Sequence, residues 1–123
     1  MSGRYLGLTG LCVLALLAAP VQAKPLTGAL TESQVRDQIL GRRLTTLDQS
    51  KSWAFWGDGE FDAPGVASRH LEYDVWPGGR LCWKANFGAK TCLRFTRRGG
   101  IVHVWRADPG HQEDLGAVTL KDL

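Results

Sequence analysis

The stretch RLCWKANFGAKTCLRF, residues 80–95, determines most of what the sequence says about the fold. Two runs that alternate apolar and polar side chains flank a short segment containing Gly88, a pattern typical of two antiparallel strands and their connecting loop. Cys82 and Cys92 stand at equal distances from Phe87. In a hairpin centred on Phe87, the two cysteines therefore face each other across the strands.

Three kinds of chemistry could explain this pair of cysteines. A redox pair usually has two residues between its cysteines, at the start of a helix, whereas the separation here is much longer. A zinc site needs about four ligands, and none of the three histidines is spaced closely to either cysteine. A disulfide fits the hairpin, and closing so short a loop should stabilise the fold by somewhat under ~3 kcal/mol. The sequence predicts a Cys82–Cys92 disulfide.

Residues 1–23 predict an exported chain. Arg4 is followed by the apolar run 6–19 and by Val21-Gln22-Ala23, which together have the three parts of a cleaved secretory signal peptide. The apolar run is shorter than the roughly 20 residues that a membrane-spanning helix needs. We therefore expect a periplasmic or secreted single domain over residues 24–123, with no transmembrane span after cleavage.

One short helix is expected near the start of this domain. Thr31 is a suitable N-cap, and Gln34 can complete a capping box with it. Leu30 and Val35 are placed to form a hydrophobic staple, and Gly41 allows the left-handed conformation that ends a helix. A helix of about nine residues is too short to be stable alone, so it should dock on the sheet.

After the helix the pattern becomes alternating, with Gly-rich turns, and the polar segment 107–114 is expected to be a loop. Residues 101–105 are apolar on both faces, which indicates a central strand or one covered on both sides. The predicted fold class is mainly β with one N-terminal helix, an antiparallel meander forming a small barrel or sandwich stapled by one disulfide. The expected strands are 43–47, 52–56, 68–76, 80–85, 91–95, 101–105 and 115–120.

Five tryptophans stand on these predicted strands. Buried aromatic side chains contribute much of the core of a small domain. The same residues could instead form a wall against a bound ligand, and the sequence leaves both interpretations open. They are Trp53, Trp56, Trp76, Trp83 and Trp105.

Charge is segregated along the chain. Acidic side chains dominate residues 57–74, whereas residues 75–107 carry basic side chains and no acidic one. Either the two segments pair across strands, where each surface ion pair stabilises the fold only slightly, or the cations form a patch for an anionic partner. The candidate anion-binding residues are Arg80, Lys84, Lys90, Arg94, Arg97 and Arg98.

The sequence contains no nucleophile, phosphate-loop or histidine-pair metal motif. His103 lies within an apolar run, so we expect it to be buried and hydrogen-bonded. The acids of residues 58–62 alternate as at the opening of a calcium loop, but Ala63 stands where an EF-hand needs glycine. We therefore expect no catalytic residue, no metal and no cofactor.

Three segments resemble a group of small exported bacterial domains of unknown function. They are LTESQVRDQILGRRL (30–44), YDVWPGGRLCW (73–83) and CLRF (92–95). The resemblance implies a Leu-Thr-led helix ending in glycine, then a β meander with a pair of cysteines, and no established activity. Helices of the group often continue Gly-Asn-Thr, whereas this chain continues Gly-Arg-Arg.

These observations lead to one expected function and two alternatives. We expect a non-catalytic binding module of the cell envelope that holds an anionic polysaccharide, lipid headgroup or acidic protein, and not a nucleic acid. The first alternative is an exported inhibitor of a lysozyme or protease, which would use loop 86–90 or the acidic tip 58–62. The second alternative is a small-ligand carrier lined by tryptophans.

Overall fold

The computed structural model describes residues 26–66, 72–84 and 90–123, so the predicted signal segment lies outside the described residues. One helix and eight strands follow each other along these residues, and no described helix is long and apolar enough to cross a membrane. The elements are α2 (Glu32–Gln38), β1 (Arg42–Thr46), β2 (Ser52–Phe55), β3 (Phe61–Asp62), β4 (Tyr73–Trp76), β5 (Arg80–Lys84), β6 (Lys90–Arg98), β7 (Ile101–Asp108) and β8 (His111–Asp122).

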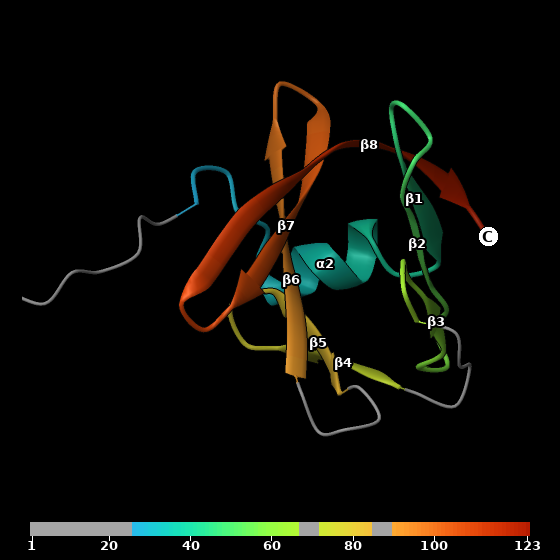
Figure 1. Ribbon diagram of the computed structural model, residues 1–123, viewed down its shortest axis with the longest axis vertical. Helices are drawn as coiled ribbons and strands as arrows, with labels where there is room; N and C mark the ends of the chain where they lie inside the picture. Colours follow the sequence, from blue (N-terminus) through green and yellow to red (C-terminus); the bar gives the residue numbers. More distant parts are fainter. Residues whose placement is uncertain (1–25, 67–71, 85–89) are drawn as a thin grey trace, which may run out of the picture.

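The strands form one antiparallel sheet in the order β3-β2-β1-β8-β7-β6-β5-β4. The two edges of this sheet, β3 and β4, approach each other. Glu60 and Glu72 form an isolated antiparallel bridge there, and the Tyr73 amide donates to the Gly59 carbonyl at 3.2 Å. The sheet is therefore a nearly closed barrel, which confirms the predicted mainly-β fold class. In Figure 1 the strands surround α2, with β1 to β3 on one side and β6 to β8 on the other.

The start of α2 has the predicted capping box. The Gln34 amide donates to Thr31 Oγ1 at 3.3 Å, and the Thr31 amide donates to Gln34 Oε1 at 2.9 Å. The helix has seven residues, slightly fewer than expected, and Ile39 is its C-cap. Gly41 then adopts a positive φ of 78°, as its position after the helix predicts.

The helix closes one end of the barrel. Val35 and Ile39 are fully buried in the same cluster as Phe55 and Phe95. The Leu30 amide donates to the Phe95 carbonyl at 2.8 Å, which ties the segment before the helix to β6. The segment also passes very close to Gly79, where an added Cβ would lie 2.1 Å from the Leu30 carbonyl oxygen, so only glycine fits.

Two features of the sheet differ from the sequence-based expectation. The segment 107–114 is not a loop, because β7 continues to Asp108 and β8 begins at His111, with only Pro109 and Gly110 in the turn. The polar side chains of this segment lie on strands that have one exposed face. The pairing between β7 and β8 therefore determines the structure of the segment more than its polar composition does. The short strand β3 was not anticipated within the acidic tip.

Other expectations are confirmed only in part. β7 is a central strand, as one of the two predicted alternatives, since it pairs with both β6 and β8, while Ile101 at its start is 54% exposed. Of the expected strand 68–76, β4 covers the last four residues, and residues 67–71 lie outside the described part of the chain.

The tryptophans divide between the core and the surface. Trp53 and Trp83 are buried, whereas Trp76 is 44% exposed. Trp105 is half-buried, and its Nε1 donates to Thr96 Oγ1 at 3.0 Å. Trp56 follows the end of β2 rather than lying within the strand.

Candidate functional site

The predicted disulfide is present and fixes the middle of the candidate site. Cys82 and Cys92 are direct partners across β5 and β6, with their Cα atoms 4.1 Å apart. This spacing is that of a non-hydrogen-bonded pair, in which the two side chains are closest. The Cys92 amide accordingly points away from β5, and it donates to Asp108 Oδ1 at 2.7 Å.

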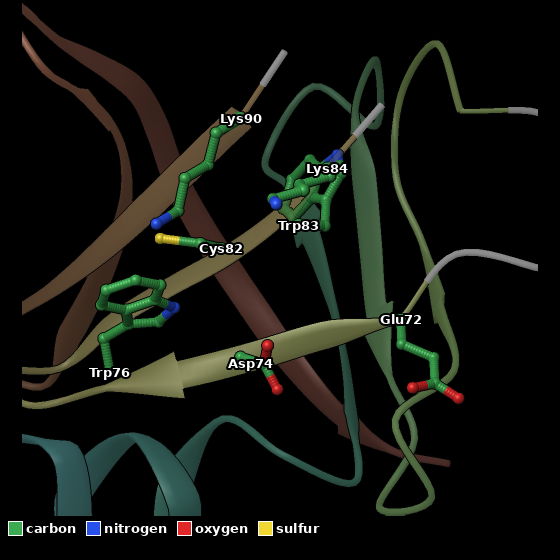
Figure 2. A pocket seen from close by; sticks show the side chains of 7 residues that line it. All are labelled: Glu72, Asp74, Trp76, Cys82, Trp83, Lys84 and Lys90. Carbon is green, nitrogen blue, oxygen red and sulfur yellow. The ribbon is translucent and has the colours of Figure 1, made fainter. Parts of the chain in front are cut away.

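A groove of about 560 Å³ lies over β4, β5 and β6 beside this disulfide. The register explains which side chains meet there, because Asp74 pairs with Cys82 and Cys82 pairs with Cys92, so all three lie on one face. Figure 2 shows the Lys90 side chain reaching past Cys82 toward Trp76, with Asp74 on β4 and Glu72 just before that strand. The groove is lined by Glu72, Asp74, Trp76, Cys82, Trp83, Lys84 and Lys90.

Lys84 and Lys90 are the two cations of this groove, and they are direct cross-strand partners. They lie two positions from the cysteines on each strand, so they too form a close, non-hydrogen-bonded pair. Like charges placed opposite each other destabilise a sheet. The Lys90 ammonium lies 3.3 Å from the centroid of the Trp76 ring, a cation–π contact that holds the charge in the groove.

Two carboxylates share the groove with these lysines. Glu72 and Asp74 come from the acidic segment of the sequence, and β4 brings them beside the basic segment on β5. Neither lysine has a salt bridge to them within the described residues. The groove therefore offers hydrogen-bond donors and acceptors side by side, around the partly exposed indole of Trp76.

The other four predicted anion-binding residues lie elsewhere. The Arg94 Nη2 donates to the Gly78 carbonyl at 2.7 Å, so this side chain holds the turn between β4 and β5. Arg80 and Arg94 line a separate hollow near Asp108. Arg97 and Arg98 stand at the far end of β6. Of the six predicted cations, only Lys84 and Lys90 therefore lie together in the groove. The other four form two separate pairs, one at the hollow near Asp108 and one at the end of β6.

Sequence reasoning missed the acidic half of the groove. The two acids were assigned to an oppositely charged segment, and only the β4–β5 register, with Asp74 opposite Cys82, places them beside the lysines. The signal that could have found them is the alternation of residues 72–76, because residues on one face of a strand recur at every second position.

Two acids of the tip 58–62, which the inhibitor interpretation invoked, already have partners within the protein. Asp58 Oδ1 accepts from the Glu60 amide at 3.0 Å and so caps its own turn. Asp62 Oδ2 lies 3.6 Å from Arg43 Nη1. Of loop 86–90, which the same interpretation invoked, residues 86–89 lie outside the described part of the chain.

His103 is hydrogen-bonded as expected, but it is not buried. Its Nδ1 lies 3.0 Å from Asp114 Oδ2, and about a third of its side chain is exposed. A hollow beside it is lined by Arg98 and Trp105. Within the described residues, no group of three or more His, Cys, Asp or Glu side chains could hold a metal ion.

Comparisons with known proteins give no relative for this fold and groove. No protein-family model matches the chain, and neither a curated protein nor a solved structure matches it. The function is therefore inferred from the chemistry of the described residues alone.

Proposed function

We propose that the protein is a non-catalytic binding module that holds an acidic polysaccharide in the groove over β4, β5 and β6. The observation that carries this proposal is the placement of Lys84 and Lys90 with Glu72 and Asp74 around the exposed Trp76. Export to the periplasm or beyond, and membership of the small exported bacterial domains that the sequence resembles, are parts of the same proposal.

The ligand class follows from the mixed charge of the groove. A purely anionic ligand would meet Glu72 and Asp74 as well as the lysines, and the like charges would oppose binding. A sugar acid carries a carboxylate for Lys84 and Lys90, and it also carries hydroxyl groups that can donate to the two carboxylates. It therefore satisfies both halves of the groove with one ring, whereas a phosphate or a side-chain carboxylate alone satisfies only the cationic half.

The lysine pair and the indole are arranged to favour such a ligand. A carboxylate between Lys84 and Lys90 would reduce their mutual repulsion, so part of the binding free energy comes from relief of an unfavourable contact in the free protein. Trp76 presents an apolar surface beside the same two charges. Aromatic side chains that keep one face accessible can cover the apolar side of a sugar ring.

Calorimetry with trigalacturonate tests this function, with galactotriose as the neutral sugar. We expect trigalacturonate to bind more tightly, and the double variant Lys84→Gln/Lys90→Gln to weaken it at least about tenfold, because both charged contacts are lost. The matched control is Arg97→Gln/Arg98→Gln, which removes the same amount of charge from the far end of β6, outside the groove, and should leave the affinity unchanged.

Three results would contradict the proposal. Equal affinity for galactotriose would show that the lysines do not select the ligand. An equal loss in the Arg97/Arg98 control would show that only net charge matters. Binding to phosphatidylglycerol vesicles or polyglutamate without binding to trigalacturonate would assign the groove to a lipid or protein partner instead.

A further inference from the structure

A second hollow opens at the end of the barrel that the helix does not close. Its volume is about 360 Å³, within the range of small-molecule sites, and the mouths of β-barrels are common places for such sites. The strands place it opposite α2. On β2 it meets Trp53 near the strand start, whereas the last residue of β2, Phe55, binds the Gly41 amide beside the helix.

The wall of this mouth is mostly apolar. Trp53, Trp83 and Leu93 line it from inside the barrel and are all nearly fully buried. Leu115 on β8 and Val66 complete the wall, and both pack against the core while remaining partly exposed. An apolar ligand would therefore lie against Leu115, Val66 and the accessible edges of the two indoles, at the surface of the core.

The rim of the mouth is cationic. Lys51 and Arg106 both line it, and no carboxylate stands among the described residues that do. The Arg106 Nε donates to Asp108 Oδ2 at 2.7 Å, which fixes the orientation of the guanidinium while about half of the side chain stays exposed. A cation oriented in this way is a good donor to a bound carboxylate or phosphate.

We propose that the barrel mouth is a second binding site, for a small amphiphile with an apolar body and one anionic head. The apolar body lies against Trp53 and Trp83, and the head meets Lys51 and Arg106. This site is separate from the polysaccharide groove in its ligand and in its charged residues, so either site can exist without the other. A long lipid does not fit the volume, which limits the ligand to a short chain or a single ring system.

Titration with decanoate, followed by tryptophan fluorescence and calorimetry, tests this site. We expect saturable one-to-one binding that is stronger than that of decanol or decyltrimethylammonium. Arg106→Gln should weaken it about tenfold, because a charge-assisted contact is lost. Lys51→Gln should weaken it about threefold, since its contact is more exposed. The matched control is Lys121→Gln, which removes the same charge near the other end of the barrel and should change nothing.

A third variant keeps the test independent of folding around Arg106. Leu115→Trp fills the mouth and should abolish decanoate binding, while the Lys84→Gln/Lys90→Gln variant should bind decanoate normally. The proposal is overturned if Leu115→Trp binds decanoate as well as the unaltered protein, if decyltrimethylammonium binds as tightly, or if decanoate binding is lost in the groove variant.

Discussion

The two ends of the barrel are held together by different interactions. At the closed end, α2 inserts Val35 and Ile39 into the apolar core beside Phe55 and Phe95. Toward the open end, polar and covalent contacts add to the apolar wall of the hollow: the disulfide joins β5 to β6, and Asp48 and Asp108 accept hydrogen bonds beside two of the turns. Apolar side chains fill the closed end, whereas the open end keeps a hollow and has additional polar and covalent contacts.

The largest expected effect concerns burial at the two ends. Ile39→Ala should lower the free energy of unfolding by about 3 kcal/mol, because it leaves a cavity in a fully buried cluster. Leu115→Ala, beside the open mouth, should cost about 1 kcal/mol or less, since the side chain already borders a hollow. Urea denaturation measures both values. Equal losses would contradict the distinction between the ends.

Removal of the disulfide should have the next largest effect. The Cys82→Ser/Cys92→Ser variant should lose about 2–3 kcal/mol of unfolding free energy, since a closed loop no longer restricts the unfolded chain. Hydrogen exchange should increase most on β5 and β6. If the amides of α2 lost protection first, the disulfide would stabilise the closed end instead, and the comparison of the ends would be wrong.

The smallest effect is a pH dependence confined to the open end. Hydrogen bonds from Ser50, and then from Thr46, lower the pKa of Asp48 to about 2. Burial alone would raise the pKa of Asp108, but hydrogen bonds from Arg106 and the Cys92 amide lower it below its ordinary value. Carboxylates with lowered pKa stabilise the fold above pH ~4, and this contribution is lost as the pH falls through their folded-state values.

Native-state hydrogen exchange, corrected for intrinsic rates, measures this effect. Between pH 5 and about 2, the amides of Ser50 and Cys92 should lose protection, because they donate to Asp48 and Asp108. The Ile39 amide donates to the Val35 carbonyl and should serve as the pH-insensitive reference. In Asp48→Asn the change at Ser50 should become smaller. An identical pH profile at Ser50 and Ile39 would contradict this difference between the ends.

The closed end was largely predictable from local sequence signals. The capping box of Thr31 and Gln34, the staple of Leu30 and Val35, and the terminal Gly41 each act within a few residues. The hairpin that aligns the two cysteines is also local, and its register was correct. Such features depend on residues that are close together in the sequence, so they can be predicted from the sequence alone.

The candidate sites depend on contacts that the sequence does not record. The groove requires β4 to pair with β5 in one register, which brings the acidic and basic segments together. The mouth requires Lys51 and Arg106, far apart in the chain, to meet at one end of the barrel. The expected loop at 107–114 was wrong for the same reason, because pairing with β7 decides the structure of polar residues such as His111 and Glu113.

The most direct measurement is an NMR titration of the tryptophan indole N–H signals with trigalacturonate. The Trp76 signal should move saturably, because its ring lies in the groove beside Lys90, while the buried Trp53 signal should stay in place. In the Lys84→Gln/Lys90→Gln variant, the trigalacturonate concentration that gives half of the maximal Trp76 shift should rise at least about tenfold. A Trp76 signal that does not respond, or that responds equally in the variant, would contradict a polysaccharide site in this groove.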